Sequence, residues 1–157
     1  MAFKSSFVGN NVKVEIADAP TAGGQATTFT TVELVSAFPA AAGSDMTIVT
    51  ANVFGEEYVQ KATGSRSVPD LNLSVFWKPG AVGQEKLATY AKARTLVQVK
   101  VTYFENIVDP DSAGYFVVLN GYISSNNVGG DFDAMATRDY VLSVTGAPVA
   151  EGEVTAK

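Results

Sequence analysis

The chain has 157 residues, enough for one domain with a substantial core, and 46% of them are apolar, which argues against disorder. It contains no cysteine and no histidine, so disulfides, thiolate metal sites and histidine-dependent catalysis are excluded. The net charge of −5 and the lack of a basic cluster argue against a surface that binds nucleic acid.

No apolar stretch is long enough to span a bilayer, and the N-terminal residues lack the apolar core of a signal peptide. The simplest expectation is a soluble product made in the cytoplasm. Residues 1–11 are expected to form a flexible arm, residues 12–146 a single β domain, and residues 147–157 a flexible tail.

Apolar and polar residues alternate with a period of two over most of the chain, which is typical of half-buried strands. The first predicted strand covers residues 12–16. A Thr-rich strand at 27–35 and a third strand at 45–51 follow it. The residues expected to share a face within the second and third strands are Val32, Leu34, Met46 and Ile48.

Residues 52–67 show no clear period and no clean strand. The segment is longer than most connections inside a compact domain, and loops of that length usually have a function. It carries two aromatic residues, Phe54 and Tyr58, among acidic and basic ones. The sequence therefore predicts a long, exposed loop.

Strands are predicted again at 71–77 and 97–103. In the first of these, Trp77 is in phase with the apolar residues before it, so it is expected in the core. The residues of the two strands that share the predicted core faces are Leu71, Leu73, Val75, Trp77, Val97, Val99, Val101 and Tyr103.

Between these two strands, residues 82–94 lack the density of β-branched residues found in the strands. Leu87, Tyr90 and Ala91 fall on one face of a helix. Glu85 lies in the first turn and basic residues lie in the last, as the helix dipole prefers. The segment is predicted to be a single amphipathic helix.

The C-terminal part of the domain is predicted to contain two more strands. Residues 114–124 are apolar on both faces at first, which indicates a strand covered on both sides. The last strand, 140–144, is expected to place Tyr140, Leu142 and Val144 inward, and residues 126–134 connect the two strands.

The predicted fold class is mostly β, an antiparallel β-sandwich or barrel of about seven strands with one α-helix. A domain of this kind leaves strand edges without partners. Self-assembly, in which edges pair with neighbouring copies, is one way to cover them.

The connection NNVGGDFDA raises the question of a calcium site, because Asp131 and Asp133 alternate there. An EF-hand loop also needs a glycine at its sixth position and a glutamate at its twelfth, and both are missing. We therefore favour a solvated loop. Asp109 and Asp111 lie in a turn and are not placed across a cleft, as glycoside hydrolysis would require.

Phosphate binding is considered for Lys61 and the sequence Ser65-Arg66-Ser67, but the glycine and lysine spacing of a phosphate-binding loop is absent. An exposed arginine is more often found in a salt bridge or a protein interface. No constellation in the sequence carries chemistry, and no cofactor or metal is predicted.

The order and spacing of three stretches resemble the major tail tube proteins of bacteriophages with long, non-contractile, lambda-like tails. The likeness extends from about residue 12 to residue 146. The stretches that carry it are SDMTIVTANVFGEEYVQKATGSRSVPDLNLSVFW, QEKLATYAKAR leading into LVQVKVTY, and GYFVVLNGYISS followed by ATRDYVLSVTG. Secretion-system tubes and pyocin tubes share this fold and remain alternatives.

The resemblance implies a structural virion protein without enzymatic activity. Six copies would form a ring, rings would stack into a hollow tube, and DNA would pass through its channel without specific binding. The implied partners are further copies of the chain and the tape measure, tail tip and tail terminator proteins, with no membrane contact. The protein would be made in the host cytoplasm and reside in the phage tail.

The resemblance also implies that the helix lies outside the channel barrel and that the segment 52–67 reaches the adjacent ring. The candidate inter-ring residues are Phe54, Glu56, Glu57, Tyr58, Lys61 and Arg66.

Two alternatives stay open. The first is a carbohydrate-binding or adhesive β-sandwich module that uses Phe54, Tyr58 and Phe76 as contacts. The second, with less support, is a small hydrolase that depends on carboxylates.

Overall fold

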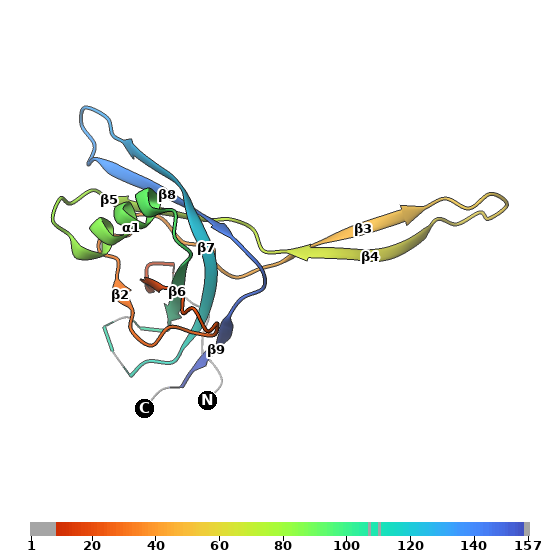
Figure 1. The fold of residues 1–157 in the computed structure, drawn as a ribbon, viewed down its shortest axis with the longest axis horizontal. Helices are drawn as coiled ribbons and strands as arrows, with labels where there is room; N and C mark the ends of the chain where they lie inside the picture. Colours follow the sequence, from red (N-terminus) through yellow and green to blue (C-terminus); the bar gives the residue numbers. More distant parts are fainter. Residues whose placement is uncertain (1–8, 107, 110, 156–157) are drawn as a thin grey trace.

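The computed structural model describes residues 9–106, 108–109 and 111–155, and Figure 1 shows their arrangement. The first eight residues of the expected N-terminal arm lie outside the described residues. The elements, in chain order, are β1 Val12–Asp18, β2 Thr30–Thr31, β3 Asp45–Ala51, β4 Gln60–Ser67, β5 Leu71–Phe76, α1 Val82–Ala93, β6 Val97–Phe104, β7 Gly114–Gly129, β8 Thr137–Val144 and β9 Ala150–Val154.

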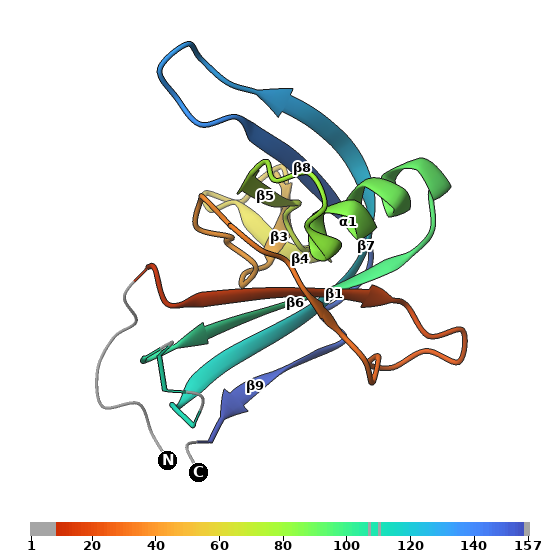
Figure 2. The ribbon, with the colours of Figure 1, turned by 90° about the vertical axis from the view of Figure 1, so that its left-hand side faces the viewer.

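Seven of the strands form one curled antiparallel sheet in the order β2-β1-β6-β7-β8-β5, with β9 joined to β7 (Figure 2). The long strand β7 organises this sheet. Its first half pairs with β6 from Gly114 to Gly121, and its second half pairs with β8. A register shift between Ile123 and Ser125 accompanies the change of partner. The predicted class, an antiparallel β fold with one helix, is confirmed, with the sheet curled into a half-barrel.

The segment after β2 connects the two edges of the curled sheet. The N–H of Val32 donates to the carbonyl of Val14 in β1 (2.8 Å), and the N–H of Ser36 donates to Ser74 in β5 (2.9 Å). Leu34, between these contacts, has a φ of 59° and an exposed side chain. A regular strand at 27–35 is therefore a wrong prediction, because this segment must turn from one edge to the other.

The core lies inside the curl, and alternation predicted most of it. Val97, Val99, Val101 and Tyr103 of β6 are all buried, as expected. Gln98 of the same strand is buried too, because the loop before β2 covers the other face: its Oε1 accepts the N–H of Ala26 and its Nε2 donates to Gly24. Further large buried side chains of the core include Val14, Ile16, Leu71, Leu73, Val75, Leu87, Val117, Leu119, Tyr140 and Leu142.

Helix α1 covers one open side of the core, begins at the predicted residue and ends one residue before the predicted end. Leu87 and Tyr90 are buried as expected, and the helix ends where Arg94 adopts a left-handed φ of 56°. Burial, together with the carboxylate of Asp18, raises the pKa of Tyr90. Among the described residues, no helix is long and apolar enough to cross a membrane.

Gln84 fixes the first turn of α1 to the sheet, and sequence analysis did not single it out. Its side chain is buried, and its Nε2 donates to the carbonyl oxygens of Glu33 (3.1 Å) and Phe76 (2.9 Å). Its Oε1 accepts the N–H of Lys78 (3.0 Å). A glutamine in an amphipathic segment gives no signal that three backbone groups will surround it.

Trp77 is not in the core, so that prediction is wrong. Strand β5 ends at Phe76, and Trp77 is 44% exposed, with its ring 5.9 Å from the guanidinium of Arg138. The backbone N–H of Trp77 donates to the carbonyl of Ala136 (2.9 Å). The alternation of β5 therefore does not continue through residue 77.

The segment 147–157, expected as a flexible tail, contains strand β9. From Ala150 to Val154 this strand pairs with the first half of β7, at the edge that β8 leaves open. Acidic residues alternate with small or apolar ones in this strand, so the sequence showed no run of apolar residues that would predict it. The carboxylate of Glu151 reaches the hydroxyl of Tyr115, whose pKa is raised by burial and by this neighbouring charge.

Candidate assembly surface

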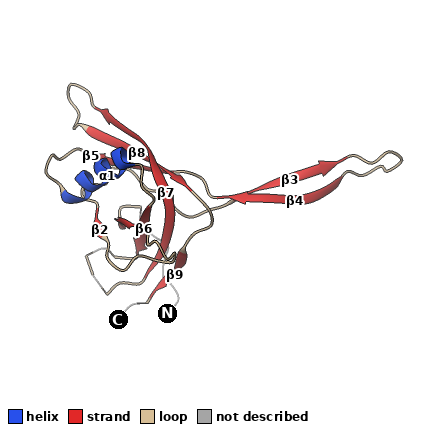
Figure 3. Ribbon diagram, viewed as in Figure 1, coloured by secondary structure: helices blue, strands red, loops and turns tan. Residues whose placement is uncertain are grey.

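Strands β3 and β4 form a separate two-stranded hairpin that projects far from the body (Figures 1 and 3). We call residues 45–67 the arm. Asp45 pairs with Ser67 at its root, and Ala51 pairs with Gln60 before the tip. Every residue of both strands is exposed. The arm thus makes no contribution to the core.

Local chemistry explains why the arm is a hairpin. The threonine, isoleucine and valine residues of β3 favour extended backbone. The register shifts between Met46 and Ile48, and Gly64 lies opposite this irregularity, where an added Cβ would come 3.0 Å from the carbonyl oxygen of Thr47. Glycine therefore allows the two backbones to approach there.

The prediction of a loop over 52–67 is wrong for its second half, because residues 60–67 form β4. Sequence alternation reports which face of a strand is buried, and β4 buries neither face. The loop is confined to residues 52–59. Similarly, the strand predicted at 45–51 exists as β3, but its Met46 and Ile48 are exposed.

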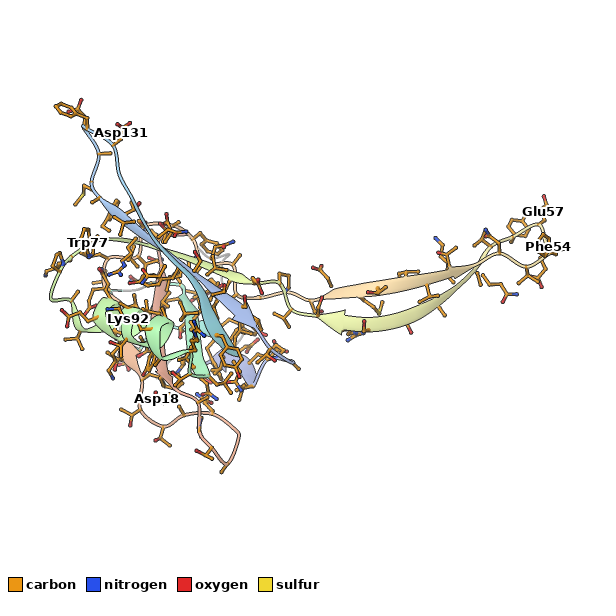
Figure 4. All side chains as sticks on the ribbon, turned by 45° about the horizontal axis from the view of Figure 1, so that its top comes forward. Asp18, Phe54, Glu57, Trp77, Lys92 and Asp131 are labelled. Carbon is orange, nitrogen blue, oxygen red and sulfur yellow. The ribbon has the colours of Figure 1, made fainter. Side chains whose placement is uncertain are left out.

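The structure divides the six candidate inter-ring residues among three places. Four of them gather in the loop that closes the arm, where Figure 4 labels Phe54 and Glu57. Lys61 lies in the part of β4 near the loop, and Arg66 lies at the root, paired with Met46. We call the first group the arm tip, and it consists of Phe54, Glu56, Glu57 and Tyr58.

The arm tip joins aromatic rings to negative charge. Phe54 is fully exposed and Tyr58 is 81% exposed. Gly55 turns the chain with a φ of 92°, and Gln60 Nε2 donates to Glu56 Oε2 (2.8 Å). Exposed aromatic side chains of this kind are typical of a contact surface.

Strand β3 and the loop after it carry exposed apolar side chains, whereas β4 is mainly polar. An isolated two-stranded hairpin is marginally stable, and both of its outer edges offer unpaired backbone groups. Neither the marginal stability of the hairpin nor its unpaired edges suit a monomer in water. The arm is therefore a candidate surface for contact with another protein. Its exposed large apolar residues are Met46, Ile48, Val49, Val53, Phe54, Tyr58 and Val59.

A groove of about 560 Å³ lies where the arm joins the body. We call it the root groove. One wall belongs to the root of the arm and the other to the turn between β8 and β9. The lining residues of interest are Arg66, Val68, Val144, Ala147, Pro148 and Glu151.

The hairpin between β7 and β8 is a second, shorter projection, and it contains the NNVGGDFDA stretch (Figure 4). Strand β7 continues to Gly129, so only residues 130–136 form the connection. Phe132 at its end is 98% exposed, and its N–H donates to the Asp131 carboxylate (2.7 Å). Within the described ranges, no three histidine, cysteine or acidic side chains gather to hold a metal.

The three aromatic residues of the carbohydrate-binding alternative do not share a surface. Phe54 and Tyr58 lie at the end of the arm, whereas Phe76 lies in β5 within the body (Figure 1). Phe76 is also half-buried. A sugar-stacking platform made of all three is therefore not present in this chain.

The fold is thus a curled antiparallel sheet with one packed helix and a long projecting hairpin. No protein-family model matches the chain, and no curated protein matches its sequence. The resemblance therefore depends on solved structures.

Solved structures share the fold, and three of them are as follows. The chain is similar to one in the hybrid solid-state NMR and cryo-EM structure of the SPP1 tail tube, with a TM-score of 0.59 and 14% identity over 96% of this chain and 80% of that one. It is similar to a chain of the 6-fold symmetrised anti-feeding prophage baseplate, with a TM-score of 0.70 and 7% identity over 99% of both chains. For the anti-feeding prophage cap, a tube terminating cap, the TM-score is 0.64 and the identity is 13% over 99% of this chain and 95% of that one.

The resemblance to tail tube proteins is thus confirmed at the level of the fold. The matched structures come from a phage tail and from a prophage particle, so they do not single out the lambda-like group.

Proposed function

We propose that this protein is the tail tube subunit of a bacteriophage, a structural protein with no catalytic role. Six copies form a ring, and rings stack into a hollow tube through which DNA passes. The observation that carries the proposal is the arm, whose strands are exposed on both faces and have no partner at their outer edges among the described residues. A neighbouring copy supplies the surface that covers it.

The matched structures support this assembly. One is a tail tube, one is a baseplate resolved with 6-fold symmetry, and one is a cap that terminates a tube. By analogy, the expected partners are further copies of the chain, a tape measure protein, a tail tip and a tail terminator. The subunit is made in the host cytoplasm and functions in the virion.

The charge of the chain suits a DNA conduit. A basic channel wall would bind DNA, because its cations displace the counterions of the phosphates. The net charge of −5 disfavours such binding. Contacts between neighbours in a ring close on themselves, and contacts between rings repeat without closure, so the same subunit forms a filament.

Electron microscopy of the concentrated protein tests the proposal. We expect hollow tubes of stacked rings, and a chain that stays monomeric under every assembly condition would contradict the proposed function. The contribution of the arm is tested by shortening it evenly. Removing residues 54–64 alone would delete most of β4 and leave β3 unpaired beyond Met46, so a matched deletion from both strands is the better variant.

A further inference from the structure

The arm carries complementary features at its two ends. We propose that the arm tip of one copy docks in the root groove of a copy in the next ring. This inference rests on the proposed function and goes beyond it, because it names both surfaces of the contact between rings.

The arm tip suits a groove that is apolar and positively charged. Phe54 and Tyr58 extend into solvent with nearly all of their surface available. Glu56 and Glu57 lie between them in the sequence. Docking would remove two aromatic side chains from water, which is the main source of affinity in most interfaces.

The root groove offers the matching chemistry. Val68, Val144 and Pro148 supply apolar lining, and its volume of about 560 Å³ falls in the range that accommodates ligands larger than an aromatic side chain. Within the described part of the chain, Arg66 has no carboxylate partner. The groove lining also carries one acidic residue, Glu151, whose carboxylate accepts a hydrogen bond from Tyr115, so only the Arg66 side of the groove is positive. Arg66 is therefore the cation available to Glu56 or Glu57.

The two surfaces cannot meet within one copy. From Asp45 to Phe54 the arm spans about 30 Å of extended chain, so the tip lies far from its own root (Figure 1). A chain with one tip and one groove joins others head to tail. Such a contact is heterologous, and when it joins copies in successive rings it repeats without closing, which is the geometry that stacking requires.

Engineered cysteines test the contact directly, because the chain has none of its own. The variant Phe54→Cys/Ala147→Cys places one thiol at the tip and one at the groove. Oxidation of its tubes with copper–phenanthroline should give a ladder of dimers, trimers and longer chains on a non-reducing gel. Each single variant should give dimers at most. The matched control Phe54→Cys/Lys92→Cys, with its second thiol on α1, should give no ladder.

A charge exchange tests the role of Arg66. Arg66→Glu should raise the critical concentration for assembly about tenfold, and adding Glu56→Lys and Glu57→Lys should bring it back to within about twofold. The control adds Asp131→Lys and Asp133→Lys to Arg66→Glu. It makes the same charge change at the other hairpin and should restore nothing.

The outcomes separate the inference from the proposed function. If the wild-type chain forms tubes but the double-cysteine variant gives no ladder, or the charge exchange restores no assembly, the docking proposal is wrong and the tube subunit stands. If the wild-type chain forms no tubes, the proposed function itself fails.

Discussion

The arm should be removable without cost to the fold. In the variant we consider, Asn-Gly replaces residues 47–65 and joins Met46 to Arg66, which face each other in the register. Asn-Gly favours the tight turn that suits a two-residue hairpin connection. The variant keeps the root groove and all of the core, because every residue of β3 and β4 is exposed.

The expected size of the effect follows from chain entropy. Measured from Asp45 to Ser67, the replacement shortens the closed segment from 23 residues to 6, roughly fourfold. Each halving of a loop lowers its closure cost by about 0.6 kcal/mol. The isolated hairpin offers little stability in return. The free energy of unfolding should therefore rise by about 1 kcal/mol, which raises the Tm by about 2–4 °C for a chain of this size.

Thermal unfolding of the dilute, unassembled protein measures this change, and electron microscopy of the concentrated protein measures assembly. We expect the shortened chain to unfold at an equal or higher temperature and to form no stacked tube. A Tm lowered by more than about 5 °C would refute the reasoning, because the arm would then stabilise the body. Stacked tubes of normal length would refute the role of the arm.

Three substitutions in the body test the packing that holds the helix and the sheet together, each by urea unfolding. Gln84→Leu should lower the free energy of unfolding by about 3 kcal/mol, because it leaves three backbone groups without a partner. A loss below about 1 kcal/mol would contradict the assigned hydrogen bonds. Gly83→Ala should lower the free energy of unfolding by about 2 kcal/mol, since a Cβ there would overlap the carbonyl oxygen of Thr31. An unchanged urea midpoint would show that the helix shifts freely. Tyr103→Phe should lower the free energy of unfolding by about 1–2 kcal/mol, because the Tyr103 hydroxyl donates to a carbonyl at 2.6 Å and accepts an N–H at 2.9 Å. An unchanged stability would argue against both hydrogen bonds. Glu85→Ala, an exposed neighbour on the helix, is the control and should change stability by less than about 0.5 kcal/mol.

The parts of the fold that the sequence predicted are those in which burial follows the backbone period. Val97, Val99 and Val101 alternate because one face of β6 meets the core, and Leu87 and Tyr90 recur with the helical period because one side of α1 does. In both elements the pattern in the sequence and the contacts in the structure have the same cause.

The errors occur where burial does not follow that period. Strand β4 is exposed on both faces, so its residues have no reason to alternate, and it was predicted to be a loop. The segment around Leu34 turns from β1 to β5 and cannot stay regular. Trp77 is one residue past the end of β5, where the alternation no longer specifies a side.

Sequence analysis named the residues of the arm tip, and their role in a contact between rings stays a prediction. The aromatic and acidic residues near Phe54 are visible in the sequence because such residues are unusual in a long exposed segment. The separation of Arg66 from them was not visible, because it depends on the hairpin that places residue 66 at the root. The root groove combines the arm with the turn after β8, which no local pattern could bring together.

Electron microscopy of the wild-type chain tests the central claim most directly. The protein is imaged as its concentration is raised from dilute to assembly conditions. The account predicts hollow tubes made of stacked rings with six subunits each, and tubes that lose their stacking when the arm is shortened. A chain that remains monomeric, or that forms solid fibres without a channel, would contradict the account.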